Sequence, residues 1–347
     1  MKSKHGYLIY GILVLAIIGI IFISGCTSQQ QNAPQTNYQK TADPGIGSAA
    51  NEIKTFGAGI FYREPVSQSP EAQLIGFSST KAPADIRLPP GGFDIKEDML
   101  VYVDDNRVIV VNPQGEKKTI EAKGIHMMAR PSLSPDAKRV VVQAADSADS
   151  NQQPDLNIYL VSLDDGTTER IGTLNYNEES PEWFAVGNKI AYTSFSSSEG
   201  INLHIYDTEE KMETHLFKGI GSIHLAISKD GKMILNPLRM QIYASSTGLV
   251  LEDFRAKLKA SIKKLGYNLD TRFPGQANLG TFPLDGDFSP DARKVVMDGA
   301  VEKDGKYYII LFTADLNGSN MLVIDTLEIT PTYSNNNNYS QLNPLWR

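Results

Sequence analysis

A pattern of apolar and polar positions recurs along this chain: an apolar residue, a short polar turn that contains aspartate, a basic residue and a run of apolar strand-forming residues. The clearest copy spans residues 131–142, where Leu133 precedes Ser-Pro-Asp-Ala and Arg139 precedes three valines. Similar segments occupy residues 227–235 and 288–297. Recurrence of one turn-and-strand unit indicates a repeat protein.

The apolar residue directly before each turn, called here the pre-turn residue, sets the phase of the repeat. Successive pre-turn residues are separated by 40, 50, 44, 61 and 58 residues. A blade of four antiparallel strands needs roughly 40 to 50 residues, so this spacing predicts an all-β protein, a six-bladed β-propeller. The pre-turn residues are Phe93, Leu133, Trp183, Ile227, Phe288 and Trp346.

The two longest intervals contain insertions. Between residues 251 and 265, apolar residues recur three or four apart with lysine and arginine between them, which predicts an inserted helix at about 251–266 with one buried stripe. We expect the basic face of this helix to be a solvated surface. The second insertion, rich in asparagine and serine, spans residues 332–340.

The two ends of the repeat region complement each other. Trp346 is followed by a single residue, so its blade cannot continue. The strand-like runs 59–63, 72–77 and 85–88 have no pre-turn residue before them. We therefore expect residues 342–346 to form the inner strand of a blade whose other three strands come from the N-terminal side. Such pairing closes the ring and protects strand edges.

The N-terminal segment predicts anchoring through a lipid. Two lysines and a histidine precede an apolar run at 7–23, which ends close to Cys26, the single cysteine of the chain. The sequence Ile-Ser-Gly-Cys at 23–26 resembles the lipobox of prokaryotic lipoproteins. This resemblance implies cleavage before Cys26, a lipid on its sulfur and a location outside the cytoplasmic membrane, on the periplasmic or cell-surface side. An uncleaved anchor or a buried apolar cysteine is the alternative.

This interpretation divides the chain into a signal peptide at 1–25, a flexible tether at 26–52 and the propeller at 53–347. The tether is rich in glutamine, asparagine, serine, threonine and alanine, with almost no large apolar side chains. It cannot bury enough surface to offset the entropy lost on ordering. A tether after a lipidated cysteine would hold a folded domain off a membrane surface.

Charge and cysteine content narrow the possible functions. The chain has 33 Lys and Arg against 40 Asp and Glu, a net charge of −7 at pH 7. This balance argues against binding to nucleic acid or to anionic lipid through a basic face. A single cysteine leaves no intramolecular disulfide and no thiolate cluster. No Gly-x-Ser-x-Gly, His-Glu-x-x-His or phosphate-loop motif occurs, and we expect no cofactor.

Asp136, Asp230 and Asp291 recur at one position of the repeat. Recurrent carboxylates could hold a metal ion, but each lies in the turn, where serine and aspartate oxygens cap backbone N–H groups. We therefore expect turn capping and assign no metal site. The histidines of the propeller region are scattered, and we expect structural or surface roles for them.

Segments 131–138, 181–183 and 288–293 resemble the TolB-type, WD-like β-propeller repeat, whose pattern is Pro-x-Trp-Ser-Pro-Asp-Gly-Lys followed by an apolar strand. The resemblance covers nearly all of residues 53–347 and implies the propeller fold. It implies little about function, because these residues build turns and blade contacts. Asp-Ala replaces Asp-Gly in two copies, and the residues before 53 leave no room for the small α/β domain that precedes the propeller in TolB.

Ligand sites on propellers usually lie at a mouth of the central channel. Polar residues just before the pre-turn positions would surround such a mouth, and their mixed charges favour a polar recognition surface over a metal site. A merely solvated rim is the alternative. The candidate ligand-binding residues are Arg130, Glu182, His224, Asp285, Asp287 and Asn343.

Two functions of different classes fit this sequence. The favoured hypothesis is a lipid-anchored, non-catalytic binding or scaffolding module for an envelope protein or a glycan, with no catalytic residues assigned. The alternative is a metal-dependent hydrolase of the lactone or sugar-acid type, with its site at the central channel.

Overall fold

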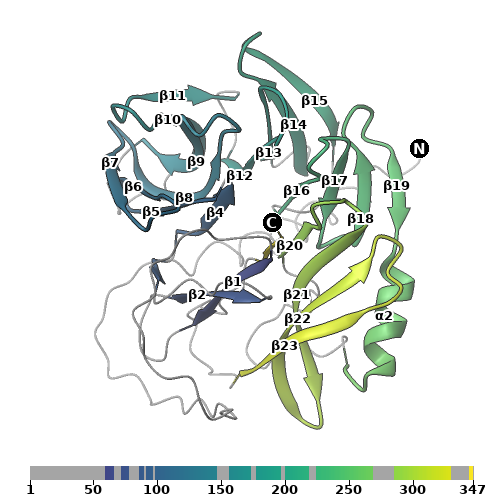
Figure 1. The fold of residues 1–347 in the computed structure, drawn as a ribbon. Helices are drawn as coiled ribbons and strands as arrows, with labels where there is room; N and C mark the ends of the chain where they lie inside the picture. Colours follow the sequence, from purple (N-terminus) through teal and green to yellow (C-terminus); the bar gives the residue numbers. More distant parts are fainter. Residues whose placement is uncertain are drawn as a thin grey trace, which may run out of the picture.

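The computed structural model describes residues 59–65, 72–77, 86–89, 91–96, 98–146, 156–172, 177–196, 200–218, 224–268, 285–329 and 344–346. The predicted signal peptide, the lipidation site at Cys26, the tether at 26–52 and the first residues of the predicted propeller, 53–58, lie outside these residues. The described strands form six four-stranded antiparallel sheets arranged around a central axis (Figure 1). The predicted all-β, six-bladed propeller is confirmed.

Each blade runs from an inner strand at the axis to an outer strand at the rim. Blade 1 contains β24 (Leu345–Trp346), β1 (Ile60–Pro65), β2 (Ala72–Phe77) and β3 (Arg87–Leu88). Blade 2 contains β4 (Phe93–Lys96), β5 (Met99–Asp104), β6 (Arg107–Val111) and β7 (Lys117–Glu121). Blade 3 contains β8 (His126–Leu133), β9 (Arg139–Ala145), β10 (Leu156–Ser162) and β11 (Thr168–Ile171).

The remaining blades follow the same order. Blade 4 contains β12 (Asn177–Trp183), β13 (Lys189–Ser196), β14 (Gly200–Asp207) and β15 (Met212–Lys218). Blade 5 contains β16 (Ala226–Ile227), β17 (Met233–Asn236), β18 (Gln241–Ala244) and β19 (Val250–Asp253). Blade 6 contains β20 (Asp285–Phe288), β21 (Lys294–Lys303), β22 (Lys306–Asp315) and β23 (Leu322–Ile329).

The core lies between neighbouring blades, so the central strands are apolar on both faces. In β9, Val140, Val141 and Val142 are all 0% exposed. Val140 and Val142 pack towards blade 2, whereas Val141 packs with Trp183 of blade 4. A strand covered on both faces appears as a continuous β-branched run rather than as an alternation of apolar and polar residues. This packing explains the run of valines after each turn.

Blade 1 is assembled from both ends of the described chain, as predicted. Strand β24 pairs with β1, with Ile60 opposite Trp346 and Phe61 opposite Leu345. Leu345 packs with the core of blades 1 and 2, and Trp346 packs with that of blades 1 and 6. The C-terminal strand therefore lies at the centre of the ring (Figure 1) and covers an edge that would otherwise be open.

The phase of the repeat is correct in five blades and wrong in blade 2. Ile95, not Phe93, occupies the pre-turn position there, because it pairs with Leu100 on the strand after the turn as Leu133 pairs with Val140. The β4–β5 connection pairs Lys96 with Met99 and is therefore much shorter than the Ser-Pro-Asp turn. Without that turn, the sequence offered no marker for the true position.

The pre-turn residues are linked from blade to blade by one recurring hydrogen bond. The acceptor is the side chain of the residue just before the pre-turn residue of one blade. The donor is the backbone N–H of the pre-turn residue in the next blade. Leu133 donates to Asp94 Oδ2, Trp183 to Ser132 Oγ and Trp346 to Asp287 Oδ2, each at 2.9 Å. The last of these bonds crosses the point where the chain closes.

The recurrent aspartates cap turns, as expected. Ser134 Oγ donates to Asp136 Oδ1 at 2.6 Å and accepts the N–H of Arg139 at 3.0 Å, and Asp136 Oδ1 accepts the N–H of Lys138 at 3.1 Å. The Ser134 hydroxyl is the main cause that lowers the pKa of Asp136. Equivalent bonds hold the turns at Ser228 and Ser289.

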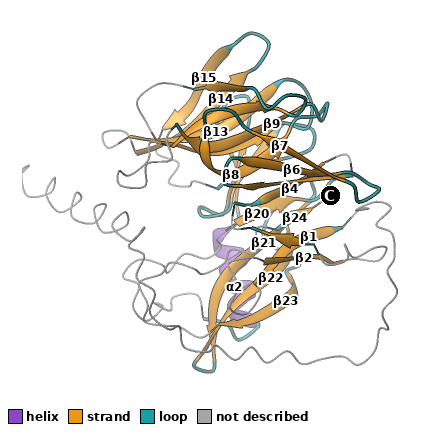
Figure 2. Ribbon diagram, turned by 90° about the vertical axis from the view of Figure 1, so that its left-hand side faces the viewer, coloured by secondary structure: helices purple, strands orange, loops and turns teal. Residues whose placement is uncertain are grey.

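The inserted helix, α2 (Arg255–Lys264), is shorter than predicted (Figure 2). Phe254, Leu258 and Ile262 are each 0% exposed and pack with residues of blades 5 and 6. Leu251 instead lies in β19 and is 53% exposed, because β19 pairs with β18 as far as Asp253. Leu265 follows the helix and is 43% exposed. None of the helices in the described ranges is long and apolar enough to cross a membrane.

Removing the closing strand should destabilise the propeller. A chain that ends at Tyr339 loses the apolar contacts of Leu345 and Trp346, and we expect its free energy of unfolding to fall by at least about 2 kcal/mol. Thermal unfolding followed by circular dichroism measures the loss. The full chain carrying Leu345→Ala and Trp346→Ala is the matched control and should show most of the same decrease. An unchanged melting temperature in both variants would contradict the closure.

Exchanging alanine and glycine at one position of the turn should change the stability in opposite directions in two of the turns. Ala137 has φ 54° and Ala292 has φ 53°, whereas Gly231 has φ 71° at the equivalent position. A residue with a Cβ is destabilised by about 1–2 kcal/mol in this left-handed conformation, and glycine avoids that strain. Part of the advantage is offset because glycine also makes the unfolded chain more flexible. Ala137→Gly should therefore stabilise the protein by about 0.5–1 kcal/mol in denaturant titration. Gly231→Ala should destabilise it, since its Cβ would lie 3.1 Å from the Phe184 ring. Equal signs for the two variants would refute this account.

Candidate functional site at the central channel

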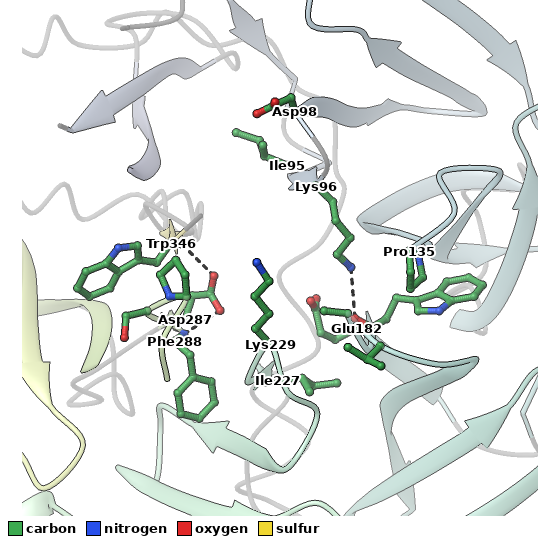
Figure 3. Close-up of a pocket in the computed structure, with 15 residues that line it drawn as sticks. Ile95, Lys96, Asp98, Pro135, Glu182, Ile227, Lys229, Asp287, Phe288 and Trp346 are labelled. Atoms are coloured by element: carbon green, nitrogen blue, oxygen red, sulfur yellow. Dashed lines mark hydrogen bonds between the residues drawn. The ribbon is translucent and has the colours of Figure 1, made fainter. Parts of the chain in front are cut away.

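Two cavities lie along the central channel. The larger of the two has a volume of about 350 Å³ and lies where the inner strands end (Figure 3). We call it the strand-end pocket. The pre-turn residues of five blades lie in its wall: Ile95, Trp183, Ile227, Phe288 and Trp346. A smaller space of about 80 Å³ lies further along the inner strands, bordered by Arg130, Ser180, Asp285 and Gly286.

The predicted ligand-binding residues divide between these two places. Arg130 and Asp285 border the smaller space, while Glu182 and Asp287 border both. His224 contacts Arg130 and is 7% exposed. Asn343 lies outside the described residues. The structure thus brings Arg130, His224 and Asp285 together as a compact group, called here the channel plug.

The channel plug joins three parts of the ring: the inner strand of blade 3, the inner strand of blade 6 and the segment that leads into blade 5. Arg130 Nη1 lies 2.9 Å from His224 Nδ1, and Arg130 Nη2 lies 3.0 Å from His224 Nε2. His224 Nδ1 is 3.4 Å from Asp285 Oδ2. Arg130 itself has φ 50° within an irregular part of β8, and its N–H donates to the Gly91 carbonyl at 2.7 Å.

Burial and mutual contact set the charges of the plug. Burial lowers the pKa of His224, and the neighbouring Arg130 lowers it further, so the imidazole is held neutral. Burial alone would raise the pKa of Asp285, but the contacts with His224 and Arg130 hold it below its ordinary value. Burial also lowers the pKa of Arg130, against the effect of Asp285 and Glu179. The plug is a largely buried and internally compensated group that borders the smaller cavity.

Two further charged residues surround the plug. Burial raises the pKa of Glu179, and Arg130 partly opposes this shift. Burial lowers the pKa of Arg63, with Arg130 adding to the effect, and Arg63 Nη2 donates to the Pro89 carbonyl at 3.1 Å. Of these two guanidinium groups, Arg130 lies near the carboxylates of Asp285 and Glu179, which partly offset its charge.

The strand-end pocket combines apolar walls with accessible charge. Lys96 Nζ donates to the carbonyls of Leu133 at 2.8 Å and Trp183 at 3.3 Å, so this cation ties three blades together. Lys229 is exposed, and its side chain extends towards the middle of the pocket (Figure 3). Val186, on the rim, is 66% exposed.

Blade 4 contains a row of polar residues that resembles a catalytic triad in its connectivity. Ser194 Oγ lies 2.7 Å from His204 Nε2, and His204 Nδ1 lies 2.7 Å from Glu213 Oε1. The other oxygen of Glu213 accepts the Tyr192 hydroxyl. Ser194, however, is 1% exposed, and Tyr192 packs in the interface with blade 3. The row satisfies buried polar groups and does not present a nucleophile to solvent.

The comparisons with known proteins concern the fold. No family model matches the chain, and no curated protein matches it in sequence. Among solved structures, TolB from Acinetobacter baumannii superposes with a TM-score of 0.54 at 16% identity, over 84% of this chain and 67% of that one. A putative TolB from Agrobacterium tumefaciens reaches a TM-score of 0.48 at 13% identity, over 80% and 92% of the two chains. Hydrazine synthase of Kuenenia stuttgartiensis reaches 0.45 at 14%, over 78% and 81%.

This chain is a TolB-like β-propeller. The predicted resemblance is therefore confirmed at the level of the fold.

The repeat of this TolB-like propeller contains a signal for the strand-end pocket that the sequence analysis missed. The second residue after the pre-turn residue lines the pocket in four blades, as Pro135, Ala185, Lys229 and Pro290. The repeat pattern has proline there, and blade 5 has lysine instead. Only residues before the pre-turn position were predicted as ligand contacts, and those after it were assigned to turn structure.

The plug should make the stability of the TolB-like propeller depend on pH through His224. Because the pKa of His224 is lowered on folding, the unfolded chain binds more protons below the ordinary value of 6.5. Stability from the neutral imidazole is complete above about pH 6.5 and is lost as the pH falls. We therefore expect the wild type to lose stability relative to His224→Gln between about pH 7 and pH 5.5.

Denaturant titrations at several pH values measure this difference. His126→Gln, at the start of β8 and outside the plug, is the matched control and should keep the pH slope of the wild type. If His224→Gln also kept that slope, His224 would not be held neutral in the folded protein.

Proposed function

We propose that this protein is a non-catalytic binding module, anchored through a lipid on Cys26 outside the cytoplasmic membrane, whose strand-end pocket receives a segment of an envelope protein or a glycan. The TolB-like fold suggests a binding or scaffolding module. The observation that carries the proposal is the open pocket with Lys229 extended into it. Its volume of about 350 Å³ falls in the usual range for ligand sites.

The chemistry of the pocket suits a chain segment with apolar and polar parts. Trp346, Val186 and the two prolines form an apolar surface, while Lys229 and Asp98 are exposed charges. Asp287 is 5% exposed, and its two oxygens accept the N–H groups of Phe288 and Trp346, so this carboxylate holds the wall rather than the ligand. Lys229 is therefore the side chain that we assign to ligand contact.

The hydrolase alternative requires a metal site or a nucleophile. The described residues contain no group of three or more His, Cys, Asp or Glu side chains placed to hold a metal ion. Asp136, Asp230 and Asp291 are engaged in their turns. A stoichiometric metal in the purified protein, measured by elemental analysis, would revive this alternative.

Lipidation at Cys26 can be tested separately from ligand binding. Expression with radiolabelled palmitate in a bacterial host should label the wild type and leave Cys26→Ser unlabelled. A wild type that stays unlabelled and soluble would contradict the anchor and leave the pocket hypothesis unaffected.

Intrinsic fluorescence offers a direct test of the pocket. The chain has two tryptophans, Trp183 and Trp346, and both line the strand-end pocket. Titration with envelope proteins or soluble peptidoglycan fragments should therefore shift the tryptophan emission when a true ligand binds. We expect Lys229→Glu to weaken this binding by about 10-fold or more, because it reverses the charge in the pocket.

The matched control is Lys117→Glu, which reverses an exposed lysine on the outer strand of blade 2. It should leave the affinity within twofold or so of the wild type. A ligand that binds without changing the emission, or one that tolerates Lys229→Glu, would place its site elsewhere.

A further inference from the structure

The inserted helix α2 has an unusual charge for a surface helix of this protein. Five of its 10 residues are cationic: Arg255, Lys257, Lys259, Lys263 and Lys264. Residues 254–268 contain no aspartate or glutamate, although the whole chain has a net charge of −7. The cations are therefore concentrated at one place on an acidic protein.

The arrangement of these cations opposes helix formation. Arg255, Lys259 and Lys263 stand at i, i+4 and i+8, so they form one row along the helix. Like charges at this spacing destabilise a helix. Burial of Phe254, Leu258 and Ile262 holds the helix in place, but it does not require lysines on the other side. A local rule broken in this way often marks a functional surface.

The lysines of α2 are exposed and have no acidic partner within the part of the chain that the structure describes. Elsewhere on the surface, cations do find such partners: Lys211 pairs with Glu169 at 2.7 Å and Lys306 with Glu328 at 3.0 Å. Lys303 adds another cation at the C-terminal end of the helix, where its Nζ lies 5.0 Å from the Tyr267 ring centre.

Apolar residues accompany this basic surface. Ala256 and Ala260 are exposed on the outer face of α2 between the lysines, and Leu265 follows them. Strand β19 leads directly into the helix along the same outer flank of the propeller (Figure 1). Just before and within β19, Leu249 is 67% exposed, Val250 50% and Leu251 53%. Glu252 and Asp253 lie between these residues and the helix, and Asp253 accepts hydrogen bonds from the Gln241 side chain and the Arg255 N–H. Exposed leucine and valine on the same flank as lysines suit the boundary between lipid headgroups and acyl chains.

We propose that the outer face of α2, with the exposed residues 249–251, docks on an anionic phospholipid surface. The charges are complementary, and each lysine near an anionic bilayer adds to the attraction. The cations extend along the helix, which fits a membrane surface better than a pocket-bound anion. This inference does not depend on lipidation of Cys26.

The net negative charge of the chain does not prevent such docking. At physiological ionic strength the Debye length is about 8 Å, so charges on distant blades are largely screened from a bilayer that touches α2. What counts is the charge within that distance of the lipid. A whole-chain balance therefore does not decide whether a surface with concentrated cations binds lipid.

The test uses the full chain with an environment-sensitive dye on Ala260→Cys and vesicles that carry a headgroup quencher. Vesicles of phosphatidylcholine alone are compared with vesicles that also contain phosphatidylglycerol. We expect strong quenching only with phosphatidylglycerol, and loss of the effect in about 1 M sodium chloride, where the Debye length is ~3 Å. Protein with the native Ala260, treated with the same dye, gives the background.

A quadruple variant, with Lys257, Lys259, Lys263 and Lys264 changed to glutamine, should reduce docking by about 100-fold or more. Glutamine has a helix propensity similar to that of lysine, so α2 should persist, which circular dichroism can verify. The matched control changes four exposed lysines of blades 2 to 4 to glutamine, namely Lys117, Lys123, Lys138 and Lys189. It should quench as the wild type does.

Equal quenching in neutral and anionic vesicles would overturn the inference, and so would an equal loss of quenching in both quadruple variants. It would also be overturned if α2 stayed unquenched and instead bound an acidic protein or nucleic acid. The lipid anchor is scored independently by flotation in neutral vesicles and by mass spectrometry at Cys26. Failure of the anchor and failure of the docking surface are thereby distinguishable.

Discussion

Covering both faces of every blade is the constraint on which this structure depends. A sheet with two apolar faces is stable only when a neighbour lies on each side, so the ring must close. Closure is achieved at the axis by hydrogen bonds between neighbouring blades. The side chain just before the pre-turn residue of one blade accepts the backbone N–H of the pre-turn residue in the next blade. Asp94, Ser132 and Asp287 play this part, and Asp287 links β20 to β24. The C-terminal strand is thus held by its backbone as well as by its side chains.

The fold was predictable because its determinants are local. Ser134, Pro135 and Asp136 specify a turn by their own chemistry, and the spacing between turns gives the blade count. Prediction failed where a tertiary contact decides the outcome. Blade 2 lacks the marker turn, so Ile95 could be located only by its pairing with Leu100. The start of α2 was misplaced because pairing with β18 keeps residues up to Asp253 in a strand.

The candidate site was less predictable, because burial cannot be inferred from polarity. Arg130, His224 and Asp285 are polar and lie close to the axis, as expected. They also contact one another at 2.9 to 3.4 Å, and Arg130 and Asp285 border the smaller cavity. Their charges compensate, which is the condition under which such groups can be buried. The accessible cation is Lys229, which occupies a turn position where the repeat pattern has proline.

Lys229 and α2 show the same relation between scaffold and function. The repeat fixes which positions must serve the turn, the strand or the blade interface, and variation is tolerated only where a side chain has no such task. The second position after the pre-turn residue faces the pocket, so lysine can replace proline there while Ser228 and Asp230 still hold the turn. In α2, Phe254, Leu258 and Ile262 supply the packing, so the outer face is free to carry five cations. In such a propeller, functional residues are therefore best sought where the repeat is broken and the fold is unaffected.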